Sequence, residues 1–215
     1  MKPPPPLRPW LLGLSLCALA GCSLLSGASK DPVTIYAPDV RVPADPAWPQ
    51  AAWQLTIMQP SAARLVDSTR INVRPSPGEL QVYRGVSWAQ SSTDLLEDTL
   101  LRAFEDSGRI AGVARAGDGI RADYKLTTDL RRFESDYAGH AVPSATIELN
   151  AKLLHAADQR IVASRTFLVA EPAASTDTAA VATAFETALR KATHDLVGWT
   201  LASGQQDALA HPGTP

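Results

Sequence analysis

Cysteine is scarce in this chain of 215 residues, which has only Cys17 and Cys22. Both lie near the N-terminus, inside or just after an apolar run, so the rest of the chain has no thiol. An internal disulfide is therefore excluded, even in an oxidising compartment. Stability must come from a hydrophobic core, which a chain of this length is long enough to build.

Excess positive charge is also missing. The chain has 20 lysines and arginines against 22 acidic residues, for a formal net charge of −2 at pH 7. Loss of Lys2 and Arg8 with an N-terminal leader would change that charge to −4. A protein that binds nucleic acid through its phosphates needs a basic face. We therefore exclude nucleic acid as a partner.

Long hydrophobic runs are absent as well. The apolar run from Trp10 to Ala20 is about half as long as the ~20 residues that span a bilayer. It follows a short positive segment and ends in Leu19-Ala20-Gly21-Cys22, which matches the lipobox of bacterial lipoprotein precursors at every position. We therefore predict a signal peptide over residues 1–21, cleaved before Cys22. The alternatives are an ordinary signal peptide with a chance cysteine, or an uncleaved anchor.

The resemblance to lipoprotein precursors implies that Cys22 carries diacylglycerol on its sulfur and an acyl chain, such as palmitate, on its amine. Each buried methylene contributes ~0.8 kcal/mol, so two or more chains give a stable anchor. Ser23 stands where an aspartate would signal retention in the inner membrane. The resemblance therefore implies a location in the periplasmic leaflet of the outer membrane, with the protein facing the periplasm.

The distribution of proline and of periodic segments predicts one folded domain. Residues 22–50 are typical of a small, polar tether followed by a proline-rich, extended segment, with Val33–Tyr36 as a candidate edge strand. We predict a single globular domain over residues 51–204. Gly204 is expected to end its last helix, and residues 205–215 are expected to form a disordered tail.

Alternating apolar and polar residues predict strands, and apolar residues at intervals of three or four predict two helices. The first helix should begin at the hydroxyls of Ser91–Thr93 and end at Gly108, and the second should begin at Asp177 or the residue before it. A break in the alternation at Arg131-Arg132 predicts a bulge or a strand end. The predicted strands are Trp53–Ile57, Thr69–Arg74, Leu80–Tyr83, Tyr124–Arg131, Ala145–Leu153 and Ile161–Val169. This order predicts an α/β (α+β-like) fold, a single two-layer domain in which two main helices pack on a mixed, mostly antiparallel sheet.

Residues that carry catalysis or bind metals are few and scattered. The sequence has no HExxH motif and no pair of carboxylates at a metal-binding spacing. His194 is adjacent to Asp195, but neighbouring residues on a helix point in different directions. The four histidines are His140, His155, His194 and His211. We predict no metal, no cofactor other than the covalent lipid on Cys22, and no enzymatic activity.

One segment comes close to a catalytic motif. The run from Gly85 to Ala89 lies between a predicted strand and a predicted helix, and it lacks only the second glycine of a nucleophile elbow. A lipid hydrolase that uses Ser87 is therefore an alternative, which a loss of activity in Ser87→Ala would support. The simpler interpretation is a loop packed by Trp88.

Three side chains in this region suit a protein contact, because amphipathic aromatics and guanidinium groups dominate binding hot spots. We predict that Tyr83, Arg84 and Trp88 bind a partner. The alternative is that Tyr83 and Trp88 pack in the core or at its rim. A second candidate surface is the polar loop that contains Asp136, Tyr137 and His140.

Several segments, taken in order, resemble one known family. They are the lipobox, Thr34–Pro38, Tyr83–Trp88, the helix that follows, and the closing strand and helix from Ile161 to Trp199. Over most of residues 33–203 the chain resembles the ABC-type transport auxiliary lipoproteins, the outer-membrane partners of MCE-type lipid-transport systems. The proline-rich stretch Val40–Pro49 departs from the family pattern.

This resemblance implies a non-enzymatic α/β domain that serves the traffic of phospholipid, or of another hydrophobic molecule, between the two membranes. It implies docking of an MCE-domain protein and of ABC transporter subunits, and it carries over no catalytic or ligand residues. The alternative is a periplasmic carrier that binds a lipid in its own cavity. A homo-oligomer is left open, because exposed aromatics and an edge strand can mediate one.

Overall fold

The computed structural model describes residues 1–2 and 32–212. The chain divides into two units, Met1–Pro32 and Val33–Pro215, and the second contains all the helices and strands described below. The predicted signal peptide and Cys22 lie outside the described residues, apart from Met1 and Lys2.

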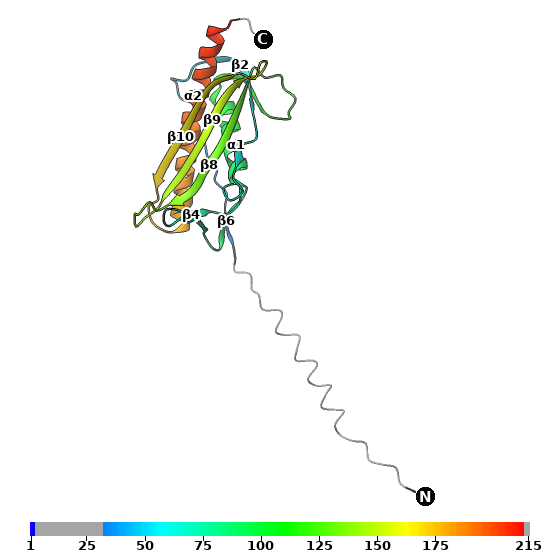
Figure 1. Ribbon diagram of the computed structural model, residues 1–215, viewed down its shortest axis with the longest axis vertical. Coiled ribbons are helices and arrows are strands. Elements are labelled where there is room, and N and C mark those ends of the chain that lie inside the picture. The colour runs from blue at the N-terminus through cyan, green and yellow to red at the C-terminus, as the bar shows by residue number, and fades with distance from the viewer. Residues whose placement is uncertain (3–31, 213–215) are drawn as a thin grey trace. The chain divides into compact units, whose positions relative to one another are not determined.

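Three long antiparallel strands form one side of the main sheet, with β10 at its edge: β8 (Tyr124–Asp136), β9 (Ser144–His155) and β10 (Ile161–Pro172). Shorter parallel strands follow one another along the other edge of β8: β2 (Ala51–Ile57), β3 (Ser61–Ala62) and β4 (Asn72–Arg74). Beyond them lie β7 (Ile110–Arg115), which pairs with β2, and β5 (Gln81–Val82), which pairs with β4. Figure 1 shows the three long strands side by side, with both helices behind them.

The predicted fold class is confirmed, and so is the irregularity in β8. The register between β8 and β9 shifts between Leu130 and Arg132, so that Leu130 and Phe133 both face the core. An extra residue of this kind resets the alternation of a strand. The strand therefore continues to Asp136. Residues Glu134–Asp136 belong to β8 and not to the polar loop that the sequence predicts from Glu134 to Pro143.

The first helix, α1 (Ser92–Ser107), has the ends that the sequence predicts. The Ser91 hydroxyl accepts a hydrogen bond from the Asp94 amide (3.2 Å), and Gly108 ends the helix with a left-handed φ of 60°. Leu96, Leu100 and Phe104 fill the core side of the helix. Local signals are thus sufficient to define this element.

The second helix, α2 (Thr178–Ala210), is longer than predicted, so the disordered tail expected from residue 205 is wrong as far as Ala210. Its 33 residues extend over about 50 Å. Gly204 is not a helix stop: an added Cβ there would lie 2.4 Å from Cζ2 of Trp53, so the glycine admits the indole. No helix among the described residues is long and apolar enough to cross a bilayer.

A substitution tests this close packing. We expect Gly204→Ala to lower the free energy of unfolding by about 1–3 kcal/mol, because the methyl group would overlap the Trp53 ring. Alanine favours a helix over glycine by up to ~1 kcal/mol, so propensity alone predicts the opposite sign. Urea unfolding measures the change, with the exposed Gln206→Ala two residues later as control. A more stable Gly204→Ala variant would contradict the contact with Trp53.

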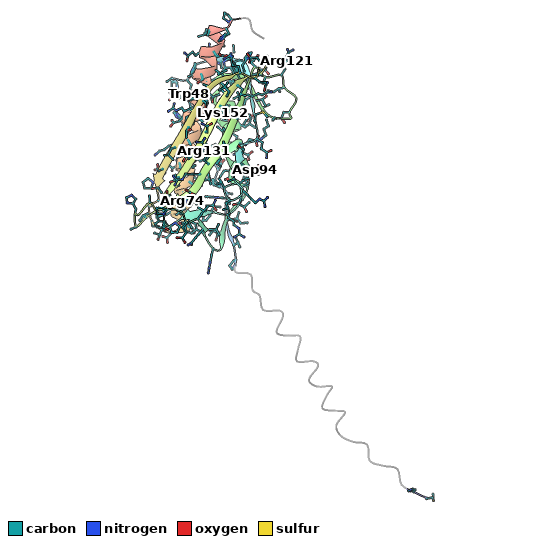
Figure 2. All side chains as sticks on the ribbon, in the orientation of Figure 1. Trp48, Arg74, Asp94, Arg121, Arg131 and Lys152 are labelled. Carbon is teal, nitrogen blue, oxygen red and sulfur yellow. The ribbon has the colours of Figure 1, made fainter. Side chains whose placement is uncertain are left out.

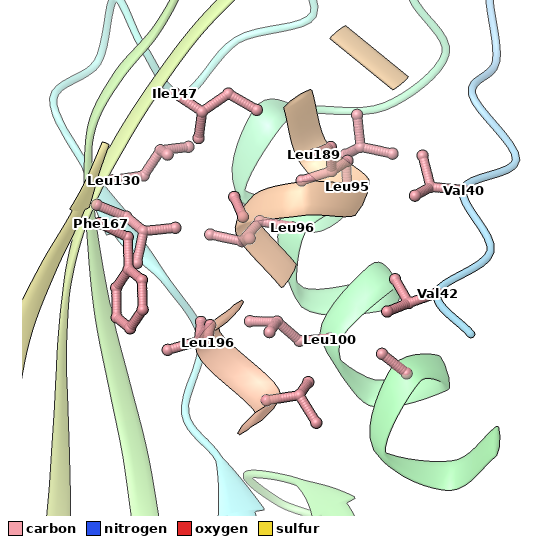
Figure 3. Close-up of a cluster of buried hydrophobic side chains, with 14 of the residues drawn as sticks. Val40, Val42, Leu95, Leu96, Leu100, Leu130, Ile147, Phe167, Leu189 and Leu196 are labelled. Atoms are coloured by element: carbon pink, nitrogen blue, oxygen red, sulfur yellow. The ribbon is translucent and has the colours of Figure 1, made fainter. Parts of the chain in front are cut away.

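The proline-rich segment is part of the folded domain, so the predicted domain start at residue 51 is also wrong. We call residues 37–49 the proline-rich strap. Val40, Val42 and Trp48 are buried, and Figure 3 shows Val40 beside Leu189 of α2. Trp48 packs on α2 as well, since a Cβ on Gly198 would lie 2.6 Å from its Nε1. The strap therefore covers part of the helix layer.

A separate two-stranded ribbon lies outside the main sheet. Its strands are β1 (Thr34–Tyr36) and β6 (Val86–Trp88), which pair in parallel. The Tyr36 hydroxyl shares a hydrogen bond of 3.0 Å with that of Thr178 at the start of α2. We refer to these two strands, with Val33 before the first, as the β1–β6 ribbon.

Candidate functional site

The predicted contact residues lie where several strand ends meet. The chain from residue 83 to 88 runs beside residues 69–71, because the Tyr83 amide donates to the Ile71 carbonyl (3.0 Å) and the Trp88 amide to that of Thr69 (2.7 Å). Gly85 turns the chain between β5 and β6 with a positive φ of 69°. Figure 1 places β4 and β6 at the end of the domain opposite the C-terminus.

Trp88 lies in the core and not on a contact surface. It is 2% exposed, and its ring contacts three other aromatic rings. The centroid distances are 6.3 Å to Tyr36, 6.0 Å to Phe133 and 5.2 Å to Phe185. The prediction that Trp88 touches a partner is therefore corrected, and the alternative of core packing describes this residue.

Tyr83 and Arg84 point in different directions from Trp88. Tyr83 is half-buried and shares a hydrogen bond of 3.1 Å with Ser135 on β8, and burial raises the pKa of its hydroxyl. Arg84 is exposed and has no carboxylate partner among the described residues. The three residues thus occupy the core, its rim and the solvent, and Arg84 alone is fully available for contact.

The second candidate surface lies next to the first. Asp136 ends β8 one residue after Ser135, which bonds Tyr83. The Tyr137 amide donates to the Arg74 carbonyl (3.0 Å), and His140 is exposed at the β8–β9 turn. The structure therefore brings both predicted contact regions to one end of the sheet.

A buried ion cluster at this end was missed by the sequence reasoning. Glu134 is 2% exposed, and it accepts hydrogen bonds from Arg74 (2.8 and 2.9 Å) and from Arg132 Nε (2.7 Å). Burial alone would raise the pKa of Glu134, but the two guanidinium groups hold it below its usual range. Arg132 also bonds Asp136, and Figure 2 labels Arg74 at this end of the sheet. Arg132, Glu134 and Asp136 alternate along β8, which is the one signal that could have revealed the cluster.

A second polar cluster fixes the far end of α2. Asp207 is buried and accepts from Arg160 (3.0 and 3.1 Å) and from the Tyr124 hydroxyl (3.1 Å). The hydrogen bonds from Arg160 hold the pKa of Asp207 below its usual range, while burial and this carboxylate raise that of Tyr124. A cavity of about 290 Å³ beside the cluster is lined by Trp53, Tyr124 and His155.

Removal of that carboxylate should loosen the end of α2. We expect Asp207→Ala to lower the free energy of unfolding by about 1–3 kcal/mol, because the buried Tyr124 hydroxyl and Arg160 lose their acceptor. Amide hydrogen exchange across residues 205–210 should accelerate. Asp195→Ala, at an exposed position on the same helix, should change neither quantity. Unchanged exchange in Asp207→Ala would contradict this role.

The residues considered for catalysis remain apart from one another. Ser87 lies on β6 opposite Ile35 of β1, and no histidine bonds its hydroxyl in the described part of the chain. His155 Nδ1 lies 2.9 Å from Asp158, and His194 lies between Asp45 and Asp195 at 3.4 Å from each. Within residues 1–2 and 32–212, no group of three or more potential ligands could hold a metal ion.

A groove lies between the edge strand β10 and α2. It has a volume of about 630 Å³ and is lined by Leu168, Val169, Thr187, Arg190 and Lys191 among others. Leu168 is 61% exposed, and a groove of this size is within the range of small-ligand pockets. It could therefore accept an apolar ligand with a negatively charged group.

Comparison with known proteins places these features in a family. The profile described as "ABC-type transport auxiliary lipoprotein component" matches residues 34–197. An uncharacterised protein of Bradyrhizobium diazoefficiens is 28% identical over 185 residues, which are 85% of this chain and 49% of that protein. The chain thus spans about half the length of this curated relative.

Solved structures share the fold. The crystal structure of protein XCC0632 from Xanthomonas campestris has a TM-score of 0.80 and 68% identity, covering 82% of this chain and 99% of that one. An uncharacterised protein of known structure has a TM-score of 0.59 at 13% identity, over 77% of this chain and 97% of its own. The second likeness concerns the fold alone.

Proposed function

We propose that this chain is a non-enzymatic docking component of an ABC/MCE-type lipid-transport system between two membranes. The reason is that the chain belongs to the family of ABC-type transport auxiliary lipoprotein components. The family match over residues 34–197 is the observation that carries this proposal, because it covers the β1–β6 ribbon, the strap, the sheet and most of α2. An MCE-domain protein and the ABC transporter subunits are the proposed partners.

The proposed anchor is the lipid on Cys22, which would hold the protein on the periplasmic leaflet of the outer membrane. The match to the lipobox and the membership of a lipoprotein family support it. Arg84 and Tyr83, which lies at the rim of the core, remain proposed contact residues. Trp88 is buried in the core and is not one of them. Mass spectrometry of the N-terminal peptide would detect the acylated Cys22, and an unmodified residue 22 would overturn the anchor.

Purification from native membranes tests the docking role. The acylated protein, solubilised in mild detergent, should carry with it an MCE-domain protein or ABC transporter subunits. A matched preparation of another outer-membrane lipoprotein controls for non-specific capture. If no transport protein co-purifies, even after chemical cross-linking in intact cells, the docking role is wrong.

A lipid carrier is the second candidate, and the groove between β10 and α2 favours it. Its wall combines Leu168 and Val169 with Arg190, which suits an acyl chain and a phosphate, while Lys191 pairs with Glu171 and Asp195 also lines the groove. Native mass spectrometry should then detect bound lipid, and Leu168→Asp should release it. Bare protein under conditions that preserve lipid complexes would exclude the carrier.

A further inference from the structure

We propose that the outward face of the β1–β6 ribbon lies on the anionic lipid surface of the membrane that holds the anchor. This inference rests on the proposed lipidation of Cys22. It assigns the exposed Arg84 to a phospholipid headgroup layer, in place of the protein contact proposed above. It also fixes which end of the domain faces the membrane.

The ribbon presents apolar side chains to solvent. Val33 is 57% exposed and Ile35 is 64% exposed, although both are strongly apolar. Because strand residues alternate between faces, these two side chains share the outward face. The opposite face carries Tyr36, whose ring contacts Trp88 in the core. The apolar pair therefore has no role in the packing of the domain.

Unpaired positive charge flanks this apolar pair. The ribbon and the segment beside it are formed by residues 33–36, 68–71 and 83–90, which contain Arg70 and Arg84 but no aspartate or glutamate. Both arginines are exposed and have no carboxylate partner among the described residues.

The described acidic residues near the ribbon form no ion pair with these arginines. Asp67 accepts a hydrogen bond from the Thr93 hydroxyl, and Asp177 accepts one from the Ser175 hydroxyl, so both keep their charge but are directed to these hydroxyls. Before the ribbon, the charges of Lys30 and Asp31 offset each other. An apolar pair flanked by free arginines suits the boundary between headgroups and acyl chains.

The length of the tether selects this end of the domain. Ten residues separate Cys22 from Val33, and a chain of that length reaches at most about 35 Å. Leu209, near the other end of α2, lies about 46 Å along the helix from Thr178, which bonds Tyr36 of the ribbon. The anchor therefore cannot reach Leu209, whereas the ribbon begins where the tether ends.

Site-specific fluorescence on the full acylated protein tests the contact. With Cys22 acylated and Cys17 removed with the leader, a single introduced cysteine is the only thiol to label. An environment-sensitive fluorophore is attached in Ile35→Cys and Arg84→Cys, and in the controls Ile161→Cys and Leu209→Cys, whose native side chains are 54% and 72% exposed and lie outside the groove between β10 and α2. The proteins are placed in vesicles of phosphatidylethanolamine and phosphatidylglycerol that contain a spin-labelled quencher lipid.

We expect quenching at positions 35 and 84 to exceed that at 161 and 209 by about twofold or more. Equal quenching at all four positions, or the strongest at 161 or 209, would overturn the proposal. Circular dichroism of each labelled variant checks the fold. The readout involves no transport protein, so a failed co-purification would leave this result intact. Mass spectrometry of the same sample separates loss of the anchor from loss of the contact.

Charge-reversal variants test the role of the two arginines. Arg70→Glu combined with Arg84→Glu should lower the quenching at position 35 in vesicles with phosphatidylglycerol, and high salt should do the same. The control is Arg121→Glu, an exposed arginine in the loop before β8, which Figure 2 labels at the end of the sheet away from Arg74. In zwitterionic vesicles the double variant should match the parent. Equal quenching in the double variant and the parent with anionic lipid would overturn the electrostatic part.

Discussion

Replacement of Trp88 by alanine should lower the free energy of unfolding by about 3–5 kcal/mol, one of the two largest losses expected for a single substitution here. The indole is 2% exposed and lies against Tyr36, Phe133 and Phe185. Its removal opens a cavity where the ribbon, the sheet and α2 meet. The effect should therefore appear in stability, and partner binding per folded molecule should be unchanged.

Urea unfolding followed by circular dichroism measures the loss. Trp199→Ala is the matched control, because Trp199 is half-buried and contacts Phe167 alone among the described rings, at 5.7 Å. We expect it to cost clearly less. A Trp88→Ala variant that is as stable as the parent but no longer binds its partner would restore the contact role that the sequence suggested.

Glu134→Gln should produce the second large effect, a loss of about 3–5 kcal/mol. The substitution keeps the shape of the side chain but removes the negative charge that Arg74 and Arg132 share. Glu148→Gln is the control on the neighbouring strand, because Glu148 lies 3.7 Å from Arg131 in a more exposed pair. Similar losses in the two variants would show that burial of Glu134 has no special weight.

The carboxylate of Glu134 should also determine part of the loss of folding stability at low pH. The pKa of Glu134 is lower in the folded state than its ordinary value of 4.5, so the unfolded chain binds the proton more readily. Its contribution to stability is therefore complete above that value and is lost as the pH falls through the lower, folded pKa. Glu134→Gln should flatten this acid limb, while Asp207, whose pKa is also lowered, should preserve part of it. An unchanged acid limb would contradict the assignment.

Sequence patterns define the elements whose signals are local. The hydroxyl of Ser91 and the left-handed Gly108 bound α1 as predicted, and the alternation in β9 and the break near Arg132 appear in the structure. Each of these features depends on residues within a few positions of one another. Local chemistry is therefore sufficient for them.

The errors occur where a residue has a distant partner. Gly204 matches a helix stop by local rules, but the structure uses it to admit Trp53 from β2. The strap has the proline content of a linker, yet its buried Trp48 packs on Gly198 of α2, a surface that only the folded domain creates. These partners are about 150 residues apart in sequence, so no local pattern could reveal them.

The candidate site was half predicted. A tryptophan next to an arginine is typical both of a hot spot and of a core edge, and composition cannot distinguish the two for Trp88. Arg84 is exposed, and its contact with a partner stays a prediction. Glu134 was placed in a loop because the bulge at Arg132 reverses the faces of β8 beyond it. The buried charge cluster followed from that reversal and was missed.

The position of the strap has a consequence for how the protein folds. Tyr36 shares a hydrogen bond with Thr178, 142 positions later in the sequence, and the ring of Trp48 contacts that of His194. The ribbon and the strap leave the ribosome early, but they can make these contacts only after α2, the last element, has been synthesised. Contacts of such long range are closed slowly, because the entropy of a large loop is lost before any contact forms. During synthesis and any export, the strap is therefore not packed on the domain. Its valines, which are buried in the folded protein, are then exposed and accessible to chaperones until α2 has formed.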